Sequence, residues 1–173
     1  MIRVEAILRD SRYQEHIKKN MIEETDRKFC RHNFQHLVDV ARITYILLLE
    51  AGDINRFMDE NCFAPDVAKE IVYASALLHD IGRWREYETG EDHALVSAQL
   101  AVEILCEAGF NDKEINIICT GIREHRRTCE NASLLGELLN RADNLSRLCL
   151  QCQAGDECYK LETMETGRRF LIY

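Results

Sequence analysis

Residues 74–83 of this chain read ASALLHDIGR, and this stretch decides the fold because an apolar helical run ends there in two ionisable side chains. The run before His79 has the composition of a buried helix. The imidazole of His79 and the carboxylate of Asp80 are costly to bury unless they are paired or bind a cation. Gly82 allows the backbone to turn sharply after them. We therefore expect a buried metal site where this helix ends.

Four further side chains of the metal-binding type lie on, or at the end of, apolar segments with helical spacing. They are His36, His93, His125 and Asp143. Imidazole nitrogen and carboxylate oxygen suit Zn, Fe, Mn, Co or Ni, and a carboxylate with two oxygens can bridge two such ions. A hydrogen-bonded core residue is the commoner explanation for any single buried histidine. The whole set nevertheless favours a site for divalent transition metal. We expect His32 to cap the helix or to support the site.

At these residues the sequence resembles the HD-domain superfamily of metal-dependent phosphohydrolases, whose pattern is a His, then His-Asp, then a distant Asp. His36 matches the first histidine, His79 and Asp80 match the pair, and Asp143 matches the last aspartate. The resemblance runs from about residue 30 to 148. It implies that these four side chains hold a first metal ion.

The resemblance extends to the dinuclear members, in which two further histidines between the His-Asp pair and the last Asp hold a second metal. His93 and His125 match them, and the resemblance implies that Asp80 bridges the two ions. His125 lies near a predicted helix end, where a histidine can simply favour the negative pole of the helix. The number of ions, one or two, therefore stays open.

The activity that the resemblance implies is hydrolysis of a phosphate ester or anhydride in a small nucleotide-like molecule, with metal-activated water as the nucleophile. Asp80 and Arg83 are the predicted catalytic residues, Asp80 as the bridge and Arg83 as the group that binds phosphate. The alternative for Arg83 is a surface cation at a helix end. Neither the lysine nor the Gly-Tyr-Pro of the related cyclic-dinucleotide phosphodiesterases follows Asp80, so that substrate is not expected.

Two other functions are compatible with the same six side chains. The set also resembles the HD-type di-iron oxygenases, in which the second metal binds oxygen and substrate. A non-catalytic sensor module that binds metal or nucleotide is the other alternative. The metal-binding residues do not separate the oxygenase from the hydrolase, whereas a full ligand set argues for an enzyme.

The length and composition of the chain limit the class of protein. Its 173 residues, 46% of them hydrophobic and 30% charged, predict one globular domain over 1–173, with an HD-type core at about 30–148. The net charge of −8 argues against long nucleic acid as the partner, but a small phosphorylated substrate can bind to local arginines and metal. Without a membrane-length apolar segment or a signal-peptide core, we expect no membrane association and a cytoplasmic location. Whether the chain forms a homo-oligomer stays open.

Helical periodicity extends through nearly the whole chain, which contains a single proline. The pattern predicts the all-α class, as a single-domain helical bundle of the HD-domain type. The expected helices cover residues 12–27, 33–50, 65–79, 93–108, 113–126 and 134–148. We expect loops at 50–64 and 85–92, and these loops would shape the substrate pocket.

The eight cysteines are better interpreted as thiols or metal ligands than as a disulfide framework, given the expected location. Three of them, Cys149, Cys152 and Cys158, follow the last predicted helix with the spacing C-x2-C-x5-C. They belong to a short Cys-rich C-terminal extension, residues 149–173. With Cys129 or Cys30 as a fourth ligand, they predict a separate zinc or iron–sulfur site. Free thiols or a local disulfide are the alternatives.

Overall fold

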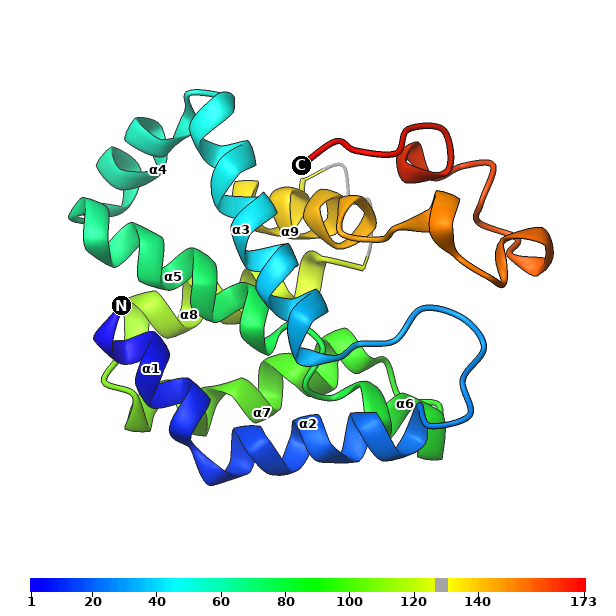
Figure 1. Ribbon diagram of the computed structural model, residues 1–173. Helices are drawn as coiled ribbons and strands as arrows, with labels where there is room; N and C mark the ends of the chain where they lie inside the picture. The colour runs from blue at the N-terminus through cyan, green and yellow to red at the C-terminus, as the bar shows by residue number, and fades with distance from the viewer. Residues whose placement is uncertain (127–130) are drawn as a thin grey trace.

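The computed structural model describes residues 1–126 and 131–173, and over these residues the chain forms helices and no β-strand (Figure 1). The α-helices are α1 (Ile2–Arg9), α2 (Ser11–Glu23), α3 (Phe34–Glu50), α4 (Asp53–Asn61), α5 (Pro65–Leu78), α6 (Arg83–Thr89), α7 (His93–Glu107), α8 (Asp112–Glu124) and α9 (Leu134–Leu145). Three short 3₁₀ helices follow: η1 (Cys149–Gln151), η2 (Gly155–Glu157) and η3 (Glu165–Gly167). The predicted all-α class is confirmed.

Helix α5 is the centre of the core. Nine of its 14 residues are buried, and it packs against α3 on one side and α8 on another. Helices α7 and α9 both pack on α8, and α9 also packs on α3. A helix that is apolar on all sides belongs in such a buried position. The His-Asp pair that follows α5 is therefore held in the interior of the protein.

Helix termini carry the predicted site residues, and local capping explains their positions. The Asn33 side chain accepts a hydrogen bond from the backbone N–H of His36, so α3 begins with His36 in its first turn. The Asp92 side chain caps α7 in the same way, and His93 is the first residue of that helix. His125 is the C-cap of α8. Their side chains thus lie where helices begin or end around α5.

The predicted loops at 50–64 and 85–92 are in part wrong, because both segments contain helix. Helix α4 has one buried side chain, Phe57, and α6 has one, Trp84. Helices this short and this exposed show too few apolar positions to reveal a period in the sequence. The N-terminal helix α1, eight residues long, was not predicted either.

The C-terminal extension packs beside the connection between α2 and α3. Figure 1 shows the extension, in orange and red, on the same side of the molecule as this blue connection. Lys28 of this connection forms an ion pair with Glu157 of the extension, and Arg147, just before the extension, donates through Nη1 to the carbonyl oxygen of Arg31 at 3.1 Å. Within the two described ranges, no helix has the length and hydropathy that a membrane crossing requires.

Candidate metal centre

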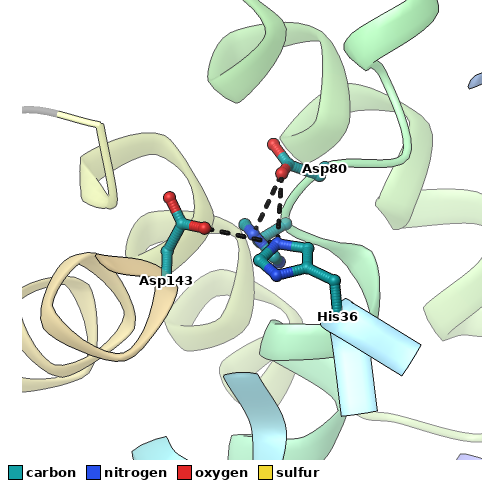
Figure 2. Close-up of side chains that lie close together, drawn as sticks. His36, Asp80 and Asp143 are labelled. Atoms are coloured by element: carbon teal, nitrogen blue, oxygen red, sulfur yellow. Dashed lines mark ion pairs between the residues drawn. The ribbon is translucent and has the colours of Figure 1, made fainter. Parts of the chain in front are cut away.

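Four side chains from three parts of the chain form the first group of potential metal ligands. His36 comes from α3, His79 and Asp80 follow α5, and Asp143 comes from α9; one ligand atom of each lies within 4.8 Å of the others. His36 Nε2 is 3.2 Å from Asp143 Oδ1 and 3.9 Å from Asp80 Oδ2. Figure 2 shows the His36 imidazole directed toward both carboxylates. These are the four residues predicted for the first metal.

A second group shares Asp80 with the first. His93 Nε2 lies 3.1 Å, and His125 Nε2 lies 3.8 Å, from Asp80 Oδ1. The other oxygen, Oδ2, lies 3.2 Å from His79 Nε2. Each carboxylate oxygen thus faces a different group of histidines, which is the geometry of a bridging ligand. The structure brings all six predicted residues together, and their role as ligands stays a prediction.

Backbone carbonyls orient two of the imidazoles. His79 Nδ1 donates to the carbonyl oxygen of Ala76, and His125 Nδ1 donates to that of Ile122, both at 2.6 Å. A carbonyl oxygen only accepts hydrogen bonds, so Nδ1 carries a proton in each ring, and the neutral form of each ring has its lone pair on Nε2. Both rings therefore present a basic nitrogen toward Asp80, as a metal-binding histidine does.

The centre contains buried polar atoms that no hydrogen bond satisfies. His79 Nε2 and Asp80 Oδ1 have no hydrogen-bond partner among the described residues, although His79 is fully buried and Asp80 is 2% exposed. Leaving such atoms unpaired costs about 1–3 kcal/mol each. Divalent cations coordinated by these atoms would remove this cost. The donor set of imidazole nitrogens and carboxylate oxygens therefore fits a transition-metal ion.

The protonation states of these groups also suit metal binding. Burial alone would raise the pKa of Asp80, but the neighbouring imidazoles, His79 first, lower it well below its usual value. Burial likewise opposes ionisation of Asp143, and Arg147 lowers its pKa. Burial, together with the charge of His79, lowers the pKa of His125 to about 4. Ionised carboxylates and a neutral imidazole are the forms that bind metals.

Arg147 contacts the centre from the side of the extension. Its Nη2 donates to Asp143 Oδ1 at 2.7 Å and to His36 Nε2 at 2.9 Å. The guanidinium thus interacts with the same two atoms that the first metal would require. This contact shows that the position attracts positive charge, and the side chain must move when a metal binds there.

Glu86, on α6, was not identified from the sequence. It contacts His93 Nδ1, and its carboxylate lies 2.9 Å from Arg83 Nη1 and 2.8 Å from Arg126 Nη2. The carboxylate orients the His93 ring so that Nε2 faces Asp80. In the sequence Glu86 is one acidic residue in a charged stretch, and no local pattern indicates these contacts.

Asn20, on α2, supports the turn that carries the His-Asp pair. Its Nδ2 donates to the carbonyl oxygen of Asp80 at 2.8 Å, and its Oδ1 accepts from the backbone N–H of Trp84 at 2.7 Å. Asn20 is fully buried. It follows Tyr13 and Ile17 on the buried stripe of α2, and a polar residue on such a stripe is the signal that could have identified it.

A cavity of about 480 Å³ opens over the two groups. Its cationic lining residues are Arg27, Arg83, Arg126, Arg147 and Lys160. Arg83 lies beside His93 in the ion pair with Glu86, and it remains the predicted phosphate ligand. Tyr159 and Met164 of the extension also line the cavity. The extension therefore supplies a wall that the prediction had assigned to loops.

His32 lies at the cavity and precedes α3, so Asn33 rather than His32 caps the helix. Its Nδ1 contacts Glu24, and its Nε2 lies 3.7 Å from Asp80 Oδ2. The ring therefore supports the site through Asp80, which is one of the two roles predicted for it.

Replacing Glu86 with glutamine should weaken the second ion selectively. Loss of the carboxylate beside His93 Nδ1 reduces the basicity and orientation of that ring, so we expect affinity for the second ion to fall about 10- to 100-fold. Isothermal titration of the metal-free protein measures this affinity. The exposed Glu88, on the same helix, provides the matched control as Glu88→Gln. Equal losses at both sites would contradict the orienting role of Glu86.

Comparison with known proteins identifies the family. The HD domain family matches residues 33–148, so the chain belongs to the HD-domain proteins, which are in general metal-dependent phosphohydrolases. The chain is 42% identical over 159 residues to an uncharacterized protein of Clostridium beijerinckii, covering 91% of this chain and 92% of that protein. No solved structure matches it significantly.

A more distant relative has a descriptive name. The chain is 30% identical over 98 residues to a bifunctional uridylyltransferase/uridylyl-removing enzyme of a Bradyrhizobium species. The similarity covers 53% of this chain but 10% of that protein, so it concerns a small part of the relative.

Proposed function

We propose that this protein hydrolyses a phosphate ester or anhydride of a small nucleotide-like molecule, and that it requires one or two divalent metal ions. One observation carries the proposal. Ligand atoms of His79 and Asp80 are buried and unsatisfied, and Asp80 lines a cavity whose wall includes several cations. The unsatisfied nitrogen and oxygen atoms can coordinate a metal ion, and the cations of the cavity wall can bind an anionic substrate next to that ion.

The potential ligands divide into two sets. His36, His79, Asp80 and Asp143 would hold a first ion, and Asp80, His93 and His125 would hold a second. Divalent ions bound there would lower the pKa of water and neutralise charge on the phosphoryl oxygens. Asp80 belongs to both sets, so it is the residue on which the proposed activity depends most.

The arginines at the cavity suit phosphate binding. A guanidinium group presents donors in a fork that matches phosphate oxygens, and Arg83 and Arg126 lie on the side of His93. Glu86 contacts both arginines, which fixes their position relative to Asp80. We therefore assign to Arg83 and Arg126 the binding and orientation of the phosphoryl group.

The size of the cavity and the named relative both support a nucleotide-like substrate. A volume of about 480 Å³ lies within the range of about 300–1,000 Å³ that is usual for small-molecule sites. The Bradyrhizobium relative is named as uridylyl-removing, and a uridylyl group is a nucleotide. We propose the same general class of substrate for this chain.

An activity screen tests the proposal. Purified protein would be assayed for release of phosphate or nucleotide products from mononucleotides, dinucleotide polyphosphates and non-nucleotide phosphates with Mn, Fe, Co, Ni or Zn. We expect release that a chelator abolishes and that at least one of these metals restores. Arg83→Gln should raise KM about tenfold without changing the metal content, because a charge-assisted contact to phosphate is lost.

The control for Arg83 is Arg85→Gln, since Arg85 is exposed on the same helix and pairs with Glu91. Oxygen uptake by the iron-loaded protein without phosphate release would contradict the proposal and favour the oxygenase alternative. Tight nucleotide binding without product under any of the metals would favour the sensor alternative.

A further inference from the structure

Four cysteines from two distant parts of the chain line a second cavity, of about 300 Å³, beside the metal centre. Cys30 comes from the connection between α2 and α3, whereas Cys149, Cys152 and Cys158 come from the extension. Cys129, the other predicted partner of this cluster, lies outside the described residues. Cys30, the predicted fourth member that belongs to the described residues, lies at this cavity.

The backbone of the extension explains why three of these thiols share one surface. Successive turns link residues three apart: Cys152 N–H donates to Cys149 O at 3.1 Å, Gly155 N–H to Cys152 O at 3.1 Å, and Cys158 N–H to Gly155 O at 3.0 Å. In 3₁₀-type turns, residues at this spacing lie on the same face. All four positions line the cavity, and Gly155 adds no side chain to it.

Contacts that involve no sulfur hold Cys30 against this face. Lys28 pairs with Glu157 of the extension, and Arg147, two residues before the extension, donates to the carbonyl oxygen of Arg31, so both flanks of Cys30 are held. Arg27 Nε also donates to the carbonyl oxygen of Cys30 at 2.8 Å. The fold therefore positions the fourth thiol independently of any bond between the cysteines.

The Cys30 thiol lies near enough to the other three to interact with them electrostatically. Burial raises the pKa of the Cys30 thiol, Arg147 lowers it, and the thiols of Cys149, Cys152 and Cys158 raise it further. Thiolates this near to one another repel unless a positive ion lies between them. None of the four is in a disulfide.

Among the described residues, no three of these cysteines have sulfur atoms within 4.8 Å of one another. The sulfur atoms therefore lie farther apart than the ligand atoms of the two His and Asp groups. Rotation of a cysteine about χ1 moves its sulfur by about 3 Å between staggered positions. Side-chain rotation in a cavity of this size is thus the movement that would gather the thiols around an ion.

We propose that Cys30, Cys149, Cys152 and Cys158 bind one zinc ion through four thiolates, at a site separate from the HD metal centre. Tetrahedral coordination by four cysteines is a standard arrangement for structural zinc, and the pair with C-x2-C spacing is typical of it. On binding, each thiol releases its proton to solvent and zinc takes the four sulfur ligands. The ion needs no change of redox state.

Such a zinc site would shape the catalytic cavity. Cys30, Cys149 and Cys158 also line the larger cavity, and Tyr159 and Lys160 directly follow Cys158 in its wall. By joining the α2–α3 connection to the extension, zinc would fix this wall over the HD centre. The site does not depend on the proposed hydrolase function.

Zinc content is the first test, and it is measured in the Asp80→Ala background so that the HD centre does not contribute. We expect about one zinc per chain. Cys30→Ser and Cys152→Ser should each reduce zinc occupancy at least about tenfold, because three thiolates bind far more weakly than four. The matched controls are Cys62→Ser and Cys106→Ser, two exposed cysteines outside this cavity, and both should retain zinc.

A second measurement uses the wild-type chain and does not depend on folding of any variant. Chelator should raise the number of thiols that react with a thiol reagent by about four, and cobalt should replace zinc with thiolate-to-cobalt charge-transfer absorption. Unchanged zinc in the Cys30 and Cys152 variants would overturn the proposal. So would iron with sulfide in place of zinc, or a disulfide that leaves fewer than four thiols available after chelation.

Discussion

Replacing Asp80 with alanine is expected to remove metal from the HD centre and to reduce phosphate release by about 10³-fold or more. Its two oxygens face the two groups of histidines, so the substitution removes a ligand from both. Elemental analysis of anaerobically purified protein measures the loss, relative to wild type, alongside the activity assay. His125→Ala should remove only the second ion, because His125 belongs to that group alone.

The control for Asp80 lies on the preceding helix. Asp66 is exposed in the first turn of α5, and Asp66→Ala should leave both metal content and activity at wild-type levels. A full metal complement in Asp80→Ala would show that Asp80 does not bridge. Loss of all metal in His125→Ala would argue against two separable ions.

Gly82→Ala is the second large effect that we expect. A Cβ on Gly82 would lie 2.8 Å from the backbone nitrogen of Ser97 and 2.8 Å from Val96 Cγ1, so it would push α7 away from the turn that carries Asp80. Such overpacking costs about 1–3 kcal/mol of the free energy of unfolding. Because α7 begins with His93, affinity for the second ion should fall as well. Chemical denaturation and metal titration measure the two effects.

Gly90→Ala separates crowding from backbone strain. Gly90 has φ +77°, and no atom of the described residues lies within 4 Å of the position that a Cβ would take there. Alanine at this position would therefore meet only the penalty of the left-handed conformation, about 1 kcal/mol. Metal affinity should remain unchanged in this variant. If Gly82→Ala matched Gly90→Ala in both measurements, the close approach of α7 would have no role in building the site.

The six potential ligands and the main helices were predictable because they depend on local chemistry. An ionisable side chain at the end of an apolar helix is costly to bury, so His79 and Asp80 stand out without a structure. The predicted helices at 33–50 and 65–79 correspond to α3 and α5, which place His36 and the His-Asp pair. The HD pattern then related these residues to Asp143, and the family match at 33–148 includes all of these positions.

Other features depend on contacts between residues far apart in the chain, and periodicity does not record such contacts. Nothing near Glu86 in sequence indicates that its carboxylate meets Arg126, and nothing near Cys30 indicates that the extension packs beside it. The amino-acid sequence was therefore sufficient for the all-α class and for naming the six candidate metal ligands that the structure brings together, because burial of each helix face is a local property. Packing alone decided which oxygen of Asp80 faces which histidines and which residues form the cavity wall, because these follow from the positions of whole helices.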